Sequence, residues 1–131
     1  MQPETILIIE DNDLNLQLAT DLLEANGCTV LQARTAEEGL LMARRNPPTA
    51  ILMDLSLPEI DGLLATSIIK SHPQTCDIII IALTAHAMKG DETIARRVGC
   101  DGYLTKPINT RTFVSDIRDL IYTARNKKEA A

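Results

Sequence analysis

Short apolar runs alternate along this chain with longer segments of helical periodicity, five times over. The runs, of mainly aliphatic or β-branched residues, cover residues 6–9, 29–33, 50–53, 78–83 and 103–105. Such alternation is typical of β-α units, in which parallel strands form one sheet and the intervening helices cover it. The run 6–9 is apolar at every position, as expected of a strand buried on both faces. The sequence therefore predicts a doubly wound α/β fold with five parallel strands.

The first two predicted helices are bounded by residues that begin or end helices. Leucines recur every four residues over 14–22, and Gly27 supplies the left-handed conformation that ends many helices. Thr35 and Glu38 have the spacing of a capping box, which predicts the start of the second helix. The two prolines at 47–48 end it.

Three further helices are predicted from the same kinds of signal. One covers residues 62–71, and another covers about 90–98 with Gly99 as its stop. Asn109 is expected to cap the last helix. The apolar face of that helix consists of Phe113, Val114, Ile117, Leu120, Ile121 and Ala124.

With 131 residues, the chain has the length of one globular domain that buries a core without disulfides or structural metals. Its three cysteines are odd in number and widely spaced, which predicts a reducing compartment. The segment 126–131 is charged and then consists of alanine only. We therefore expect the domain to cover residues 1–125 and the segment 126–131 to be a flexible tail.

Charge and composition argue against several classes of protein. A net charge of −5 with only 2% aromatic residues provides neither a basic patch nor a stacking surface for nucleic acid. The longest apolar run, residues 78–83, is far too short to cross a membrane. The N-terminus lacks the basic and apolar segments of a secretory signal. The expectation is a cytoplasmic protein that binds neither nucleic acid nor membrane.

Polar residues follow the predicted strands at positions where this type of sheet carries its ligand site. Ligands of open parallel sheets bind outside the carboxyl ends of the strands. Glu10 and Asp11 follow the first strand, Asp54 the third, Thr84 the fourth and Lys106 the fifth. Three carboxylates at one edge repel each other unless a cation neutralises them. Each of these residues alone would be an ordinary solvated loop residue, but their joint placement indicates a cation site.

A hard divalent cation fits this set of ligands. Mg²⁺ prefers oxygen ligands and is commonly bound by one or two carboxylates together with a phosphate. Aspartate is a nucleophile in proteins that form an aspartyl phosphate. Such a phosphoryl transfer also needs positive charge and hydrogen-bond donors, which Lys106 and Thr84 provide. The strand ends therefore point to Mg²⁺-dependent phosphoryl transfer.

Five motifs follow the predicted strands in order: Glu10-Asp11, Met53-Asp54, Leu57-Pro58-Glu59-Ile60-Asp61-Gly62, Thr84-Ala85 and Lys106-Pro107. With these motifs, the whole chain resembles the receiver domain of two-component response regulators. No single motif is specific, but the ordered set on the right elements is. The resemblance implies a flavodoxin-like sheet of strand order 2-1-3-4-5 with five flanking helices.

The resemblance also implies roles for the acidic residues. Asp54 resembles the residue that accepts the phosphoryl group, and Glu10 and Asp11 resemble the pair that positions Mg²⁺. Ser56 matches the position whose backbone carbonyl binds the metal. The expected phosphoryl donor is a phosphohistidine on a histidine kinase or a histidine phosphotransferase.

Further residues resemble the family's switch. Thr84 resembles the hydroxyl that moves toward the phosphoryl group, and Lys106 resembles its counter-ion. Tyr103 stands at the position of the aromatic residue that turns inward, and Pro107 at that of a cis peptide. These matches imply that phosphorylation changes the face made by the fourth helix, fifth strand and last helix, where a downstream protein would bind.

The run 85–92 is similar to that of a single-domain regulator of the bacterial cell cycle. Receivers of hybrid histidine kinases share much of this run, so an excised receiver of that kind remains the alternative. His86 stands in the switch loop at a position that varies in the family, which leaves the lifetime of the phosphorylated state open. We expect a protein that is not an enzyme beyond its own phosphorylation and dephosphorylation.

Four other functions fit the sequence less well. A flavodoxin-type flavin site needs a phosphate-binding loop and stacking aromatics, whereas residues 10–13 are mostly acidic. A calcium loop from Asp11 would need glycine and glutamate where Leu16 and Leu22 stand. No serine, histidine and aspartate are placed for a hydrolase. A phosphatase of the same fold would need a second acid at position 56, which is serine.

Overall fold

The computed structural model describes residues 4–55, 62–85 and 91–130. In chain order its elements are β1 (Thr5–Ile9), α1 (Asp13–Ala25), β2 (Thr29–Ala33), α2 (Ala36–Arg45), β3 (Ala50–Asp54), α3 (Gly62–Ser71), β4 (Ile79–Thr84), α4 (Asp91–Val98), β5 (Gly102–Thr105) and α5 (Phe113–Ala130). The strands form one parallel sheet in the order β2-β1-β3-β4-β5. This confirms the expected fold class and strand order.

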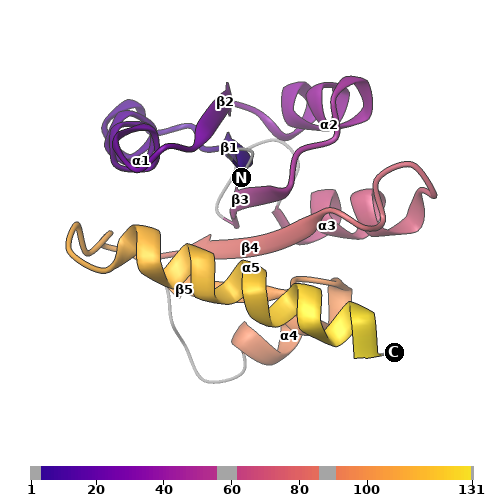
Figure 1. Cartoon of the computed structure of the whole chain (residues 1–131). Helices are drawn as coiled ribbons and strands as arrows, with labels where there is room; N and C mark the ends of the chain where they lie inside the picture. Colours follow the sequence, from indigo (N-terminus) through magenta and orange to yellow (C-terminus); the bar gives the residue numbers. More distant parts are fainter. Residues whose placement is uncertain (1–3, 56–61, 86–90, 131) are drawn as a thin grey trace.

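Helices cover both faces of the sheet, with α5 crossing in front of β4 and β5 in Figure 1. Successive side chains of a strand point to opposite faces. Ile6 and Ile8 of β1 accordingly pack in a core with residues of α1 and α5. Leu7 and Ile9 pack in a second core with residues of α2, α3 and α4. Both faces of β1 are therefore buried from Ile6 to Ile9, where every residue is apolar.

The predicted helix boundaries follow local chemistry. The N–H of Glu38 donates to the hydroxyl of Thr35 at 3.1 Å, which begins α2 as the capping pattern predicts. Gly27 and Gly99 adopt positive φ angles of 87° and 116° after α1 and α4. The prediction that Asn109 caps the last helix is wrong: its side chain accepts from the N–H of Arg111 in a turn, and α5 begins only at Phe113.

Several boundaries differ from the sequence-based prediction: β1 begins at Thr5, β3 ends at Asp54 and β5 begins at Gly102, each one residue beyond the predicted range. Strand β4 begins at Ile79, because the N–H of Ile78 donates to Thr75 in the preceding turn. Helix α5 continues through Ala130, so the segment from residue 126, which we expected to be a tail, is helical. Lys, Glu and Ala are good helix formers, and nothing in this segment breaks a helix. The flexibility of the segment and the domain boundary at residue 125 stay predictions.

Lys70 and Asp101 form a group of hydrogen bonds at the amino ends of β4 and β5. The Nζ of Lys70 donates to the carbonyl of Ile78 and to Oδ2 of Asp101, both at 2.8 Å. The same Asp101 oxygen accepts from the N–H of Ile80. This ion pair joins α3 to the start of two strands, at the edge opposite to their carboxyl ends.

None of the described helices has the length and apolarity needed to span a membrane.

Candidate functional site

The carboxyl ends of the strands bring the predicted site residues to one edge. Glu10 directly follows β1, and its N–H donates to the carbonyl of Ala33 at the end of β2. Asp54 is the last residue of β3, and Thr84 is the last residue of β4. The N–H of Lys106 donates to the carbonyl of Thr84 at 2.7 Å. Backbone pairing in the sheet therefore fixes the positions of the Cα atoms from which these side chains extend.

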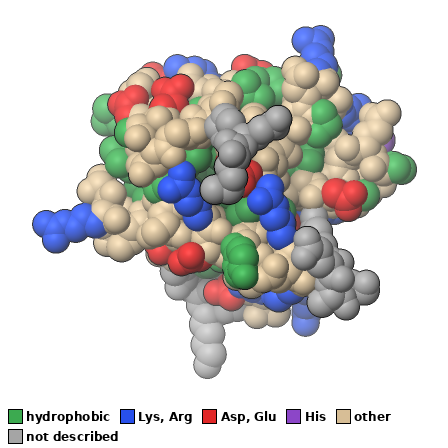
Figure 2. Space-filling view, in the orientation of Figure 1, with side chains coloured by type: hydrophobic (Ala, Val, Ile, Leu, Met, Phe, Trp, Pro, Cys, Tyr) green, Lys and Arg blue, Asp and Glu red, His purple; other side chains and the backbone are tan. Residues whose placement is uncertain are grey.

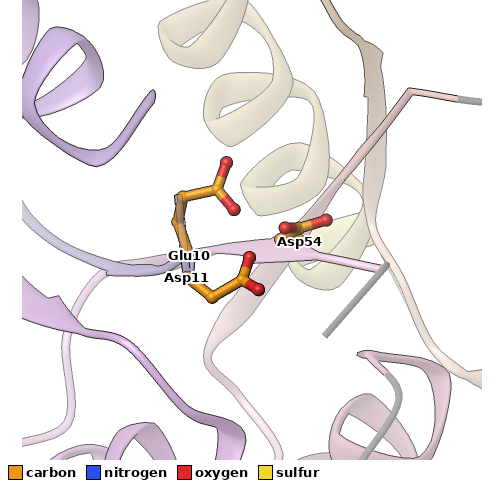
Figure 3. A group of neighbouring side chains, drawn as sticks. All are labelled: Glu10, Asp11 and Asp54. Carbon is orange, nitrogen blue, oxygen red and sulfur yellow. The ribbon is translucent and has the colours of Figure 1, made fainter. Parts of the chain in front are cut away.

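Three carboxylates gather at this edge (Figure 3). Oxygen atoms of Glu10, Asp11 and Asp54 lie within 4.8 Å of one another. Glu10 and Asp54 are each only 2% exposed, whereas Asp11 is exposed to solvent. Two carboxylates are thus taken out of water close to each other, which is unfavourable unless a cation compensates their charge.

Lys106 provides part of that compensation. Its Nζ lies 2.9 Å from Oε1 of Glu10 and 3.3 Å from Oδ2 of Asp54. Burial by itself lowers the pKa of Lys106, but the hydrogen bond to Glu10 and the charges of both acids raise it above its usual value. The lysine therefore stays protonated and bridges the two buried carboxylates.

One ammonium does not neutralise three carboxylates. Burial first, and then the hydrogen bond with Asp54 and its charge, together raise the pKa of Glu10 from 4.5 to about 7, against the opposing effect of Lys106. In addition, Oε2 of Glu10 is buried and has no hydrogen-bond donor among the described residues. The remaining negative charge and the buried Oε2 of Glu10 would therefore be stabilised by a second cation at the acidic cluster.

This raised pKa predicts how stability depends on pH in Mg²⁺-free solution. The native state holds the Glu10 proton more tightly than the unfolded state, so the free energy of unfolding should fall as pH rises from about 4.5 to about 7. The full effect is about 3 kcal/mol. Urea unfolding between pH 4.5 and 8 measures it.

The Glu10→Gln variant is the control for this pH dependence. It keeps the size of the side chain but does not titrate, so its stability relative to the parent protein should increase across the same pH range. Equal pH dependence of the two proteins would contradict the assignment of a raised pKa to Glu10.

The remaining predicted site residues divide into described and undescribed ones. Thr84 is buried, and Tyr103 lies half-buried on β5 against the core that contains α2, α3 and α4. The Lys106–Pro107 peptide bond is cis, the geometry that the resemblance implies. Ser56 and His86 lie outside the described residues.

Sequence reasoning missed one contact within the site. A Cβ atom on Gly62, the first residue of α3, would lie 2.7 Å from the carbonyl oxygen of Asp54. Gly62 entered the sequence analysis only as part of the motif 57–62. An Asp-Gly pair marks a turn, and this signal does not say which atom the glycine approaches.

Comparison with known proteins identifies the family. The family model of the response regulator receiver domain matches residues 6–118. The chain belongs to this family. A curated relative from Brucella anthropi, the polar-differentiation response regulator DivK, is 42% identical over 119 residues, which are 91% of this chain and 97% of that protein. DivK is the single-domain regulator to which the run 85–92 pointed.

Solved receiver structures agree with the fold. The receiver domain of a sensor histidine kinase from Pseudomonas aeruginosa, solved with a magnesium ion coordinated in its active site cleft, is 32% identical with a TM-score of 0.82, covering 91% of this chain and 98% of that one. A response regulator from Chloroflexus aurantiacus is 29% identical with a TM-score of 0.86, covering 92% and 98%. Thus this receiver resembles both stand-alone regulators and a receiver of a histidine kinase.

Proposed function

We propose that this receiver accepts a phosphoryl group on Asp54 from a phosphohistidine of a histidine kinase or a histidine phosphotransferase. The observation that carries the proposal is the position of Asp54. Its buried carboxylate lies among two other acids, with the Nζ of Lys106 at 3.3 Å. Receiver domains belong to two-component systems, whose kinases and phosphotransferases are the partners of the family as a whole.

Mg²⁺ is the cofactor that fits the residues present. Glu10, Asp11 and Asp54 offer only oxygen ligands, and Oε2 of Glu10 is a buried acceptor without a donor among the described residues. The backbone carbonyl of Ser56, outside the described residues, is proposed as a further ligand. When bound, Mg²⁺ would neutralise charge that develops on the phosphoryl oxygens. The magnesium ion in the related Pseudomonas receiver supports this assignment.

The protein's own groups act on the phosphoryl group as follows. An oxygen of Asp54 attacks phosphorus, a P–O bond forms, and the P–N bond to the donor histidine breaks. The electron pair of that bond goes to the imidazole nitrogen. Lys106 and the hydroxyl of Thr84, which end or follow neighbouring strands, then bind the phosphoryl oxygens. The imidazole leaves as a neutral ring because its other nitrogen carries a proton in the reacting donor, and the product is an acyl phosphate on Asp54.

Phosphorylation is proposed to act as a switch. The added charge at Asp54 attracts Thr84, and Tyr103 on the adjacent strand β5 turns inward when Thr84 moves. The face of α4, β5 and α5 then differs between the two states, and a downstream protein binds one state more tightly. A useful response needs a coupling free energy of a few kcal/mol.

Charge supports the expected absence of nucleic acid among the partners. The net charge is −5, and acidic and basic side chains are interspersed on the face seen in Figure 2. We propose a cytoplasmic protein that interacts with other proteins and with neither nucleic acid nor membrane. A receiver that acts as part of a hybrid histidine kinase would use the same site, so that alternative changes the partner and not the chemistry.

Incubation with a small phosphoramidate donor tests the proposal. With Mg²⁺ present, the protein should acquire one phosphoryl group, seen by intact-mass spectrometry as a base-labile adduct. With excess EDTA the rate should fall by about 10²-fold or more, because the charge on the phosphoryl oxygens is then uncompensated. Lack of labelling with Mg²⁺, or labelling at equal rates with and without it, would contradict the proposal.

A further inference from the structure

The backbone of Asp54 is in close contact with the first residue of α3. A Cβ atom on Gly62 would lie 2.7 Å from the carbonyl oxygen of Asp54 and 2.8 Å from the Cα of Leu55. Among the described glycines, Gly62 is the one whose added Cβ would meet backbone atoms within 3 Å. At Gly39 and Gly99 the corresponding atoms belong to side chains, which adapt more easily.

Helix α3 is not free to move away from this contact. The hydroxyl of Thr66 donates to the carbonyl of Gly62 at 2.8 Å, and Thr66 is completely buried. Ala65 and Ile69 on the same helix are also buried in the core beside α2 and α4. Since protein interiors are closely packed, moving α3 outward would open a void along this face.

The strand is held from its other side. Asp54 pairs in register with Leu83 of β4, and the N–H of Leu55 donates to the carbonyl of Leu83 at 3.1 Å. The Asp54–Leu55 peptide therefore lies between β4 and the first turn of α3. Any atom added at Gly62 has to displace this peptide or the helix by several tenths of an ångström.

We infer that Gly62 is a positioning residue for phosphoryl transfer: by lacking a side chain, it lets α3 press against the Asp54 peptide and hold the carboxylate at the acidic cluster. This inference rests on the proposed phosphorylation of Asp54. A displacement of about 1 Å at a reacting group costs about 10²-fold in rate, so a shift of several tenths of an ångström matters.

The test compares Gly62→Ala with the parent protein and with Gly102→Ala. Phosphorylation by the phosphoramidate donor is followed over a range of donor concentrations with Mg²⁺ present. The rate at saturating donor should fall about 10–100-fold in Gly62→Ala, because the carboxylate is misplaced. The donor concentration for half-maximal rate should stay unchanged, since the surface that meets the donor is the same.

Gly102→Ala is the matched control. This buried glycine also gains a tight contact, 3.1 Å from side-chain atoms of Leu120, but it begins β5, whereas Asp54 ends β3 and β4 lies between these two strands. Its stability to urea should decrease while its saturating rate stays that of the parent protein. A Gly62→Ala rate equal to that of Gly102→Ala would overturn the inference.

A second variant keeps the test decisive if Gly62→Ala does not fold. Thr66→Val removes the hydroxyl that holds the carbonyl of Gly62 but keeps the volume of the side chain. Its saturating rate should also decrease, and an unchanged rate would overturn the inference. If the parent protein itself does not become phosphorylated, the proposed function fails; if it does and these variants match it, only the role of Gly62 fails.

Discussion

Asp54→Asn should lower the rate of phosphorylation by about 10³-fold or more, because an amide is a poor nucleophile and loss of a nucleophile removes most of an enzyme-like rate. The substitution nearly preserves shape, so the buried position, 2% exposed in the parent protein, is still filled. Intact-mass spectrometry after incubation with the donor and Mg²⁺ measures the loss. Persistent labelling of the variant at the parent rate would contradict the assignment of Asp54.

A second readout shows whether the variant acts through the acidic cluster. Asp54 raises the pKa of Glu10, so its replacement by a neutral amide should lower that pKa from about 7 toward the ordinary value of 4.5. The titration of Glu10 can be followed by NMR of its side-chain carboxyl carbon. Asp119→Asn, an exposed position on α5, is the matched control and should leave both the labelling and this pKa unchanged.

Lys106→Met should act in opposite directions on metal binding and on phosphorylation. In the parent protein the Lys106 ammonium lies 2.9 Å from Glu10 and 3.3 Å from Asp54, where it competes with Mg²⁺ for these carboxylates. Since methionine carries no charge, Mg²⁺ should bind the variant several-fold more tightly above pH 7. The phosphoryl group loses a donor, so the rate of phosphorylation should fall by about 10²–10³-fold. Isothermal titration calorimetry with Mg²⁺ and the donor assay measure the two effects.

Lys70→Met is the matched control for this prediction. Lys70 is also a half-buried lysine in an ion pair, with Asp101 at 2.8 Å, but it lies at the opposite edge of the sheet. Its loss should cost about 1–3 kcal/mol of stability because Asp101 is left without its charge partner. Mg²⁺ affinity and phosphorylation should not change.

A fall in Mg²⁺ affinity of Lys106→Met would show that the lysine helps to build the metal site instead of competing with the ion.

Local chemistry explains why so much of the fold was readable from the sequence. The ends of α1, α2 and α4 depend on single residues such as Gly27, Thr35 and Gly99, whose conformations and caps are nearly independent of the rest of the chain. The continuous apolar run of β1 is required because both faces of that strand are buried. The acids at the strand ends were readable for the same reason, since all parallel strands end at one edge.

The structure adds to the sequence where packing between distant segments decides the outcome. The segment after residue 125 is helical in α5, while its flexibility stays a prediction. The tight contact of Gly62 with Asp54 depends on how α3 sits on β3, and no local pattern records that distance.

The sequence by itself determined the order of the elements, the edge at which the acids meet and the family, because these follow from periodicity and from the residues next to each strand. Only the tertiary structure decided that Lys106 bridges Glu10 and Asp54 and that the pKa of Glu10 rises to about 7. Both depend on burial and on distances of a few ångströms between segments far apart in the chain. Desolvation and Coulomb energies are set by those distances, and a linear sequence does not contain them.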